Sequence, residues 1–176
     1  MTLIGYAHPR QRTEAVTFEE FLHAELTGLA RFAGAVCGDP HLAEDVLSEA
    51  LLAVSDRWSR IGRMEFPLAY VRRVVTSTFL SDRRRTSRRR TQTTGDLIAL
   101  DRVQEDGAAA VGERDEVRRL LATLTVQQRT AVALRYLFDQ TDDEIAAVLD
   151  CSAATVRSHL SHARSSLRLT VAAERG

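Results

Sequence analysis

A basic helical face without carboxylates lies near the end of the chain, from Ser152 to Arg164. At helical spacing Val156 and Leu160 form part of an apolar stripe, and the opposite side carries hydroxyl, imidazole and guanidinium groups. Such groups hydrogen-bond to base edges and to phosphates, and no acidic residue occurs between Ser152 and Arg168 to repel a nucleic acid. We therefore predict that this face recognises DNA, the alternative being the solvated side of an ordinary helical hairpin.

The helix with this face is expected to follow a shorter helix across a tight turn. Thr141 and Glu144 have the spacing of a capping box, which begins a helix. The residues Asp150-Cys151-Ser152 interrupt the helical pattern, and Ser152 is expected to cap the next helix. Two helices joined in this way predict a helix-turn-helix, although Asp150 occupies a position at which such turns often have glycine.

Charge is distributed unevenly along the chain. The 24 basic residues, all of them arginine, balance 24 acidic residues, so the formal net charge is zero. Residues 61–90 nevertheless contain nine arginines against Glu65 and Asp82, whereas residues 91–150 contain twelve acidic residues against six arginines. The last 26 residues are basic again. A nucleic acid would meet these two basic segments separately, so the net charge does not exclude DNA as a partner.

The apolar residues recur at helical spacing and β-branched residues do not alternate, which predicts an all-α fold. We expect two small helical domains, residues 17–90 and 113–170, and the second contains the helix-turn-helix. A flexible acidic linker, residues 91–112, is expected to join them, with one helical turn around Leu97–Val103. Residues 1–16 are expected to be a disordered lead-in, and 171–176 a tail.

Three helices are expected in the first domain. The first begins at Thr17, where Glu20 completes a capping box, and ends at Gly38. The second begins with Asp39-Pro40 and extends to Trp58, and residues 61–66 form a loop. The third begins at Pro67 and leads into an arginine cluster at residues 83–90; the side chains that we expect on its outward side are Arg72, Arg73, Ser77 and Thr78.

In the second domain, an amphipathic helix is expected over Val117–Leu124. Thr125 and Gln128 form a further capping box, which begins a helix that precedes the helix-turn-helix. Apolar side chains that we expect to be buried in this helix include Val132, Leu134 and Leu137.

Several classes of function are not indicated. Cys37 and Cys151 lack a CxxC partner, so each is interpreted as a small buried hydrophobe. His159 and His162 could share a metal ion, but no third ligand is evident. We find no phosphate-binding glycine loop, nucleophile elbow or acid/base pair, and therefore expect neither catalytic residues nor a cofactor. No signal peptide or membrane-spanning run occurs, so we expect a cytoplasmic protein without membrane insertion.

Taken together, these segments resemble the extracytoplasmic-function (ECF) group of bacterial sigma factors, across nearly the whole chain outside the tails and linker. AEDVLSEALLAVSDRW at 43–58 looks like the family's polymerase-binding helix, and PLAYVRRVVTSTFLSDRRR at 67–85 looks like its −10 helix. The segment at 124–164 looks like the family's −35-reading domain. The resemblance implies an RNA polymerase sigma factor that binds core polymerase through the β′ clamp and the β flap, recognises promoter DNA and assists its opening.

The same resemblance assigns residues to three surfaces. Core-polymerase binding is implied for Asp45, Ser48, Glu49 and Leu52, with Ser48 at a position where the family commonly has glutamine. Binding of the −10 element, including a flipped base, is implied for Arg60, Arg63, Phe66, Arg72, Arg73, Ser77, Arg83 and Arg84. Binding of the −35 element is implied for Ser152, Thr155, Arg157, Ser158, His159, Ser161, His162 and Arg164.

Two points stay open at the level of the sequence. A dimeric helix-turn-helix regulator that acts without core polymerase would also explain residues 124–164, but it leaves the helix at 43–58 and the arginine cluster unexplained. An anti-sigma factor is a possible further partner, because no appended regulatory domain is evident in the sequence.

Overall fold

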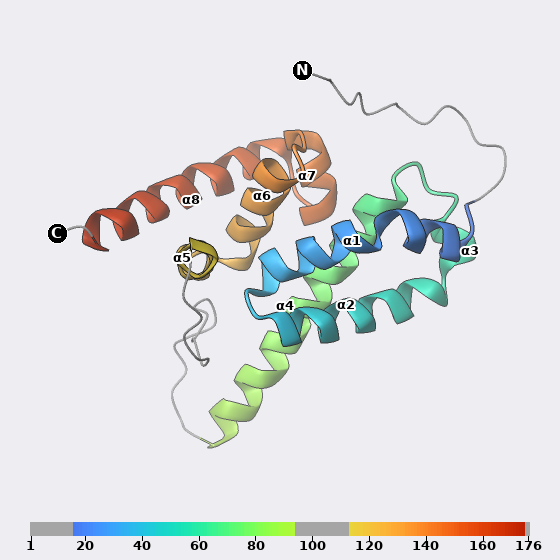
Figure 1. Cartoon of the computed structure of the whole chain (residues 1–176), viewed down its shortest axis with the longest axis horizontal. Helices are drawn as coiled ribbons and strands as arrows, with labels where there is room; N and C mark the ends of the chain where they lie inside the picture. The colour runs from blue at the N-terminus through green and yellow to red at the C-terminus, as the bar shows by residue number, and fades with distance from the viewer. Residues whose placement is uncertain (1–15, 94–112, 175–176) are drawn as a thin grey trace.

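The computed structural model describes residues 16–93 and 113–174, and all regular structure in these residues is helical, as the sequence predicts. Figure 1 shows two groups of helices that lie against each other. The helices are α1 (Phe18–Cys37), α2 (Pro40–Ser55), α3 (Trp58–Ile61), α4 (Pro67–Thr93), α5 (Glu113–Ala122), α6 (Val126–Leu137), α7 (Asp142–Leu149) and α8 (Ala153–Glu174). The expected lead-in up to residue 15 and the expected linker at 94–112, with its helical turn, lie outside the described residues.

All three capping boxes expected from the sequence are present. Thr17, Thr125 and Thr141 each accept a hydrogen bond from a backbone N–H in the first turn of α1, α6 and α7. The side chain at the third helical position returns a bond to the backbone N–H of the capping residue. Asp39 caps α2 in a simpler way, with Leu42 N donating to Asp39 Oδ1 at 2.7 Å. These local bonds satisfy N–H groups that have no partner inside the helix, so they define where each helix begins.

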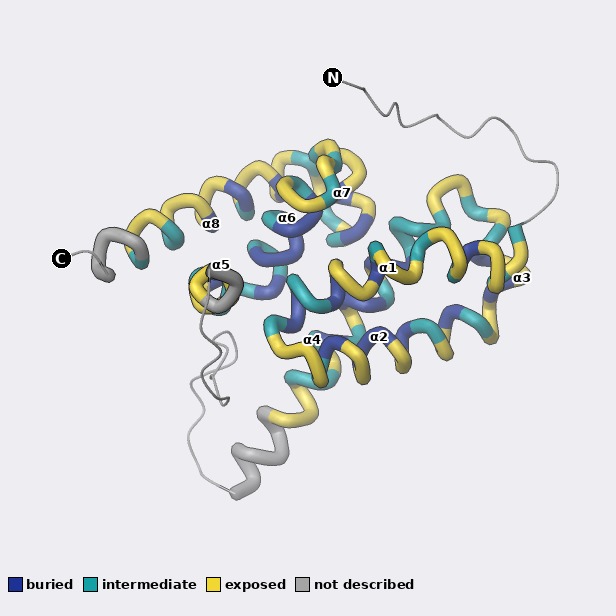
Figure 2. Tube along the Cα trace, in the orientation of Figure 1, coloured by how far each residue is buried: buried dark blue, intermediate teal, exposed yellow. Residues whose placement is uncertain are grey.

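The first domain consists of α1 to α4, with α1, α2 and α4 packed around shared apolar side chains. Figure 2 shows buried stretches on each of these helices. The fully buried residues include Phe32, Val36, Ala50, Val54 and Val71. Helical spacing predicts Ala53 on the same side of α2 as Val46 and Ala50, but Ala53 is exposed. The arrangement leaves the outward side of α2, with Asp45, Ser48 and Glu49, exposed.

The connection between α2 and α4 differs from the expected single long helix. Helix α2 ends at Ser55, and a separate turn, α3, begins at Trp58. The indole Nε1 of Trp58 donates to Val16 O at 2.7 Å, and its ring packs 4.6 Å from the ring of Phe21. This contact with residues more than thirty positions away, which helical periodicity does not reveal, redirects the chain after α2.

Two helices are longer than the sequence pattern indicated. Helix α4 continues to Thr93, through the arginine cluster, because arginine has a high helix propensity and does not interrupt the backbone. Helix α8 continues to Glu174, across most of the segment expected to be a tail. Helix α8 also packs against α5.

The second domain consists of α5 to α8, and its core lies where α6, α7 and α8 meet. Leu134, Ile145, Val148, Val156 and Ala163 are all buried there. Leu137 was expected inside and is 48% exposed, so that expectation is wrong. It lies at the last residue of α6, where the helix has already left the core.

The two domains share a continuous apolar core. Helix α1 packs against α6, and α4 packs against α7, so the buried cluster extends from Phe21 in the first domain to Leu160 in the second. In Figure 1 the second group of helices lies directly along α1 and the first half of α4. The two helical domains are therefore in direct contact through their apolar cores.

The cysteines lie within this packing. Cys37 is buried, and burial raises the pKa of its thiol to about 12, so it stays protonated and behaves as an apolar side chain, as expected. Cys151 is half-buried beside Leu149, and burial likewise raises the pKa of its thiol. Among residues 16–93 and 113–174, no helix is both long and apolar enough to cross a bilayer.

Candidate nucleic-acid and polymerase interfaces

The helix-turn-helix expected from the sequence consists of α7, the turn at residues 150–152, and α8. Asp150 adopts the left-handed conformation, with φ 56° and ψ 48°, and its N–H bonds to Ala146 O. Aspartate tolerates this conformation better than most residues, which explains how the turn forms without glycine. Ser152 then caps α8 by accepting a hydrogen bond from Thr155 N at 3.1 Å.

Helix α8 presents the expected polar face. The exposed residues on it are Thr155, Arg157, Ser158, Ser161, His162 and Arg164, whereas Val156, Leu160 and Ala163 are buried on the opposite side. Ser152 is also exposed, but its hydroxyl lies 2.9 Å from that of Thr155, so these two groups are already hydrogen-bonded to each other. Guanidinium groups and hydroxyls on one exposed helical face are suited to bases and phosphates.

Arg157 is held by a carboxylate on the preceding helix. Its Nη1 lies 3.3 Å from Asp142 Oδ2, and the other oxygen of Asp142 bonds to Arg135 at the end of α6. Asp142 therefore connects α6, α7 and α8 through one carboxylate. Arg157 remains 63% exposed, so its guanidinium is oriented and still accessible to a ligand. Neither Asp142 nor Arg135 was among the site residues expected from the sequence. Both are too far from Arg157 in the sequence for helical spacing to indicate the contact.

His159 is half-buried, unlike its neighbours on this face. Burial lowers the pKa of its imidazole, and the nearby His162 lowers it further. The lowered pKa favours the neutral form of this imidazole. In the described parts of the chain, no group of three or more His, Cys, Asp or Glu side chains could hold a metal ion.

The exposure of the arginines on α4 agrees only in part with the expectation from the sequence. Arg73, Ser77 and Arg84 are exposed and Arg83 is half-buried, with its guanidinium 5.9 Å from the ring centroid of Phe79. Arg72, which we expected to point outward, is only 5% exposed. That expectation is wrong in this conformation, because the second domain covers the side of the helix on which Arg72 lies.

The segment before α4 holds three of the expected −10 residues on the surface. Arg60 and Arg63 are exposed, and Phe66 exposes 63% of its surface although it is aromatic. The backbone of this segment packs closely against the indole ring of Trp58 at Gly62. A Cβ atom at this position would lie 2.9 Å from Trp58 Nε1. Glycine at this position lets the chain pass close to the indole ring, which leaves the two arginines and the phenylalanine on the outside.

The outward side of α2 carries the four residues expected to bind polymerase. Asp45, Ser48 and Glu49 are exposed, and Leu52 is 70% exposed at the next helical turn. Glu49 lies 3.9 Å from Arg85 of α4, an ion pair in solvent that contributes little to stability. A large apolar side chain beside acidic groups is a surface suited to a protein partner.

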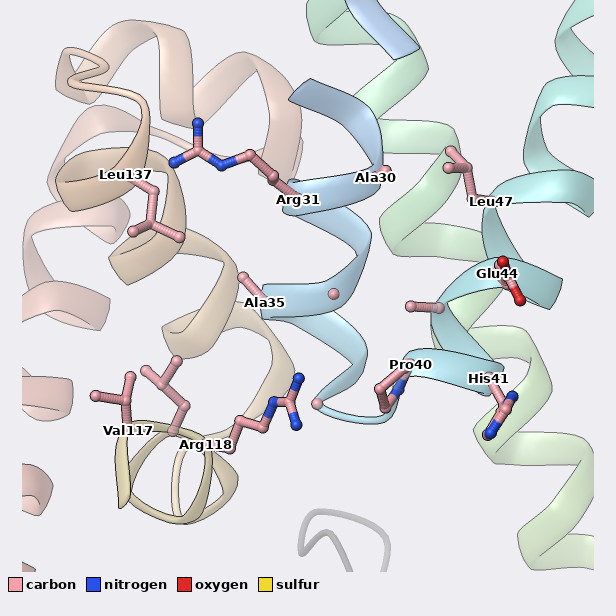
Figure 3. Close-up of a pocket in the computed structure, with 14 residues that line it drawn as sticks. Ala30, Arg31, Ala35, Pro40, His41, Glu44, Leu47, Val117, Arg118 and Leu137 are labelled. Carbon is pink, nitrogen blue, oxygen red and sulfur yellow. The ribbon is translucent and has the colours of Figure 1, made fainter. Parts of the chain in front are cut away.

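A cleft of about 910 Å³ separates the two domains on the side of α5. Figure 3 shows Val117 and Arg118 of α5 opposite Ala35 and Pro40 of the first domain. The domains are therefore in close contact along α4 and α7 but not along α5.

Comparison with known proteins gives a family match for each of the two domains. The family model described as Sigma-70 region 2 matches residues 21–89, and that of Sigma-70 region 4 matches residues 114–167. The RNA polymerase sigma-E factor of Streptomyces avermitilis is 31% identical over 155 residues, which cover 88% of this chain and 85% of that protein. The sigma-E factor of Streptomyces coelicolor is 30% identical, covering 88% and 86%.

One solved structure has a similar fold. It is the complex of the sigma factor RpoE with the anti-sigma factor NepR from Bartonella quintana, with a TM-score of 0.67 and 22% identity over 88% of this chain and 96% of that one. The matched regions lie in both domains and follow the order of a sigma factor, which disfavours the dimeric regulator. The chain belongs to the sigma-70 family and is a sigma factor of the ECF group.

Proposed function

We propose that this sigma factor docks on core RNA polymerase through α2 and reads a promoter with two separate surfaces, one in each domain. The observation that carries the proposal is that a single chain has both an exposed acidic and apolar face on α2 and a carboxylate-free basic face on α8. A protein that bound only DNA would not need the exposed acidic and apolar face on α2. Holding both surfaces on the polymerase raises their effective concentration along the same duplex.

In this proposal the face on α2 contacts the β′ clamp. Leu52 loses its exposed apolar surface on docking, and Asp45 and Glu49 flank it with charges that select a basic partner surface. Ser48 has a shorter side chain than glutamine, so it makes fewer contacts there. The second domain contacts the β flap, which places α8 over the −35 element.

For the −35 element, the reading residues are Arg157, Ser158, Ser161 and His162. Arg157 is pre-oriented by Asp142, which reduces the entropy lost when its guanidinium binds a base. Arg164 and His159 lie nearer the phosphates. Ser152 accepts a hydrogen bond from Thr155 N, and the other backbone N–H groups at the start of α8 can donate to a phosphate.

For the −10 element, Phe66 stacks on a base that Arg60 and Arg63 help to hold out of the duplex. Extruding a base costs a few kcal/mol, and stacking on an exposed aromatic ring with phosphate contacts offsets that cost. Arg73, Ser77, Arg83 and Arg84 then follow the DNA backbone along α4.

We also propose that the protein acts in the cytoplasm, by binding and without catalysing a reaction of its own. An anti-sigma protein is a reasonable partner, since the structural neighbour from Bartonella quintana was solved with one. Such a partner would control the access of this factor to the polymerase.

Transcription from a pool of genomic DNA fragments, with core polymerase and with or without this protein, tests the proposal. We expect discrete start sites that require the protein and that share −10 and −35 sequences. The variant Arg157→Ala should lose most of these transcripts. Its matched control is Arg168→Ala, which removes an exposed arginine from the same helix beyond the reading residues.

No protein-dependent start sites, together with operator binding by a dimer in the absence of polymerase, would overturn the proposal. Equal loss of transcripts in Arg157→Ala and Arg168→Ala would reject the specific assignment of Arg157, because the effect would then be one of general charge.

A further inference from the structure

The end of helix α4 extends beyond the apolar core of the first domain. Phe79 is buried in that core and Leu80 packs against it, whereas residues 81–93 contain no apolar side chain. Figure 1 shows this end of α4 projecting past α1 and α2. At about 1.5 Å per residue, residues 81–93, called the arm below, extend the helix by about 20 Å. The arm therefore has no apolar face with which to pack against another helix.

The charge of the arm opposes a helix in isolation. It contains six arginines and a single carboxylate, that of Asp82. Arg84 and Arg88, like Arg85 and Arg89, are four residues apart, and like charges at this spacing destabilise a helix. A short helix without an apolar face is also marginal in water. A polyanion bound along the arm would neutralise the repulsion, so the charge and the helical backbone together indicate an anionic partner.

The three arginines at residues 83–85 lie on different sides of the helix. The guanidinium carbon of Arg83 lies 5.9 Å from the ring centroid of Phe79, and Arg85 Nη1 lies 3.9 Å from Glu49 Oε1 of α2. Arg84, between them in sequence, is exposed. Because consecutive residues of a helix are about 100° apart, a run of arginines distributes its charge around the axis and forms no single reading face. Such a distribution is suited to phosphates and not to base edges.

The position of the arm in α4 determines which part of a promoter it would meet. The opposite end of α4 begins at Pro67, directly after the segment proposed to hold an extruded base of the −10 element. The arm therefore lies away from the melted bases, at the end from which the chain continues to the −35 domain. A promoter remains double-stranded between its two elements. From Arg84 to Arg90 the helix rises about 9 Å, the length of about three base pairs.

We propose that the arm is a binding surface for double-stranded DNA, and that it contacts phosphates between the −10 and −35 elements without reading their sequence. The proposal rests on the function proposed above and adds a third DNA contact to it, which Arg84 joins to the −10 surface. Phosphate contacts add affinity that depends strongly on salt and is the same for every promoter sequence. RNA or an acidic protein surface would satisfy the same charge, and the experiment is designed to separate these partners from duplex DNA.

A triple variant removes the charge of the second group of arginines in the arm, Arg88→Gln/Arg89→Gln/Arg90→Gln. Glutamine has a helix propensity close to that of arginine, so the helix is retained. The matched control removes three exposed arginines that lie outside the surfaces assigned to DNA and polymerase, Arg57→Gln/Arg119→Gln/Arg168→Gln. Both variants lose the same charge, and circular dichroism compares their helix content with that of the parent.

Holoenzyme is formed from core polymerase and each protein, and its affinity for a promoter fragment from the fragment-pool assay is measured over a series of salt concentrations. We expect the triple variant to bind more weakly than the parent. The slope of log affinity against log salt should become shallower by about 0.9 for each arginine that meets a phosphate. The control should keep the slope of the parent.

A second promoter fragment locates the contact on the DNA. Uncharged methylphosphonates replace phosphates between the −10 and −35 elements, and the same number of replacements upstream of the −35 element gives the control fragment. The parent should lose affinity when the replacements lie between the elements, whereas the triple variant should lose much less. Both proteins should respond equally to the control fragment.

A triple variant with the salt dependence of the parent would overturn the proposal. Equal losses of affinity by the parent and the triple variant on the fragment modified between the elements would also overturn it, because the arm would then contact RNA or the polymerase instead of this duplex. Failure of the triple variant to form holoenzyme, measured by native gel electrophoresis, would assign the arm to the polymerase and would likewise overturn the DNA contact.

The function proposed above is tested separately, since it fails if the parent directs no start sites in the fragment-pool assay. Because the arm does not read sequence, the free chain then tests it on a duplex of random sequence at low salt. We expect the parent and the control to bind this duplex more tightly than the triple variant does. Equal binding by all three proteins would overturn the proposal for the arm, whatever the result with polymerase.

Discussion

Asp142 illustrates how the proposed −35 surface on α8 depends on a residue outside that surface. Its carboxylate pairs with Arg157 of α8 and with Arg135 of α6, and its side chain is 26% exposed. It also lies in the first turn of α7, where a negative charge interacts favourably with the helix dipole. Asp142 is therefore both a stabilising and a positioning residue.

We expect Asp142→Asn to lower the free energy of unfolding by about 1 kcal/mol, because charge-assisted hydrogen bonds to two arginines are lost. It should also reduce transcription that depends on the −35 element, since Arg157 is no longer held in place. Chemical denaturation and the fragment-pool assay measure the two effects. Asp143→Asn, in the same turn, should change neither by a comparable amount, and equal effects would contradict the positioning role.

The imidazole of His159 gives the same face a dependence on pH. Burial, with a smaller effect from His162, lowers the pKa of His159 in the folded protein. The unfolded chain then binds a proton at a higher pH than the folded chain does, so stability falls as the pH drops through the unfolded pKa.

An NMR titration should find the pKa of His159 below 6.5, the ordinary value for histidine. The variant His162→Gln should raise the pKa of His159 only partway, because burial is the larger cause. The variant His159→Gln should reduce the loss of stability under mildly acidic conditions. A pKa at or above the ordinary value would show that His159 is more solvated than its position indicates.

At the scale of the element, the helix-turn-helix depends on its caps. Thr141 and Glu144 satisfy each other's backbone N–H groups at the start of α7, with Thr141 N donating to Glu144 Oε2 at 2.8 Å. Ser152 performs a similar function for α8. Local hydrogen bonds therefore define where each of the two helices begins.

The variant Thr141→Ala should destabilise the protein by about 1 kcal/mol, because it leaves a backbone N–H at the start of α7 without its partner. Thr141→Ser retains the hydroxyl and should remain within a few tenths of a kcal/mol of the parent. Thermal denaturation followed by circular dichroism measures both. Equal destabilisation by serine and alanine would attribute the loss to the methyl group instead of the cap.

At the scale of the whole molecule, Arg129 joins two domains that the sequence separates. Burial and the nearby Arg83 lower the pKa of its guanidinium to about 10, so it remains charged at neutral pH. Its two backbone acceptors lie in different domains, at Val36 in α1 and at Leu124 just before α6. Loss of this side chain should therefore weaken the coupling between the domains as well as their stability.

Replacing Arg129 with methionine keeps an unbranched side chain but removes the guanidinium group, so two carbonyl groups are left without their donor. We expect a loss of roughly 2–4 kcal/mol, because buried unsatisfied polar groups are costly. Calorimetry should show the single transition of the parent broaden or divide as the domains begin to unfold separately. Arg129→Lys retains the charge and should show a smaller effect. One sharp, unshifted transition in the methionine variant would contradict the coupling.

The sequence by itself determined the local structure and the chemistry of the exposed faces. Capping boxes at Thr17, Thr125 and Thr141 were predictable because the bonded groups are three residues apart. The polar face of α8 was predictable because helical periodicity alone decides which side chains share a side. The assignment of those faces to −10 DNA, −35 DNA and polymerase remains a proposal.

The contacts between the two domains could be determined only from the tertiary structure. The burial of Arg72 under Phe138, the pairing of Arg73 with Asp150 and the bond from Arg129 to Val36 join residues that are distant in sequence. Periodicity identifies Arg72 as a side chain outside the core of the first domain, yet its guanidinium carbon lies 5.9 Å from the ring centroid of Phe32 and 4.4 Å from that of Phe138. Its burial depends on the position of a second domain, and position in space arises from packing between elements, which no local pattern contains.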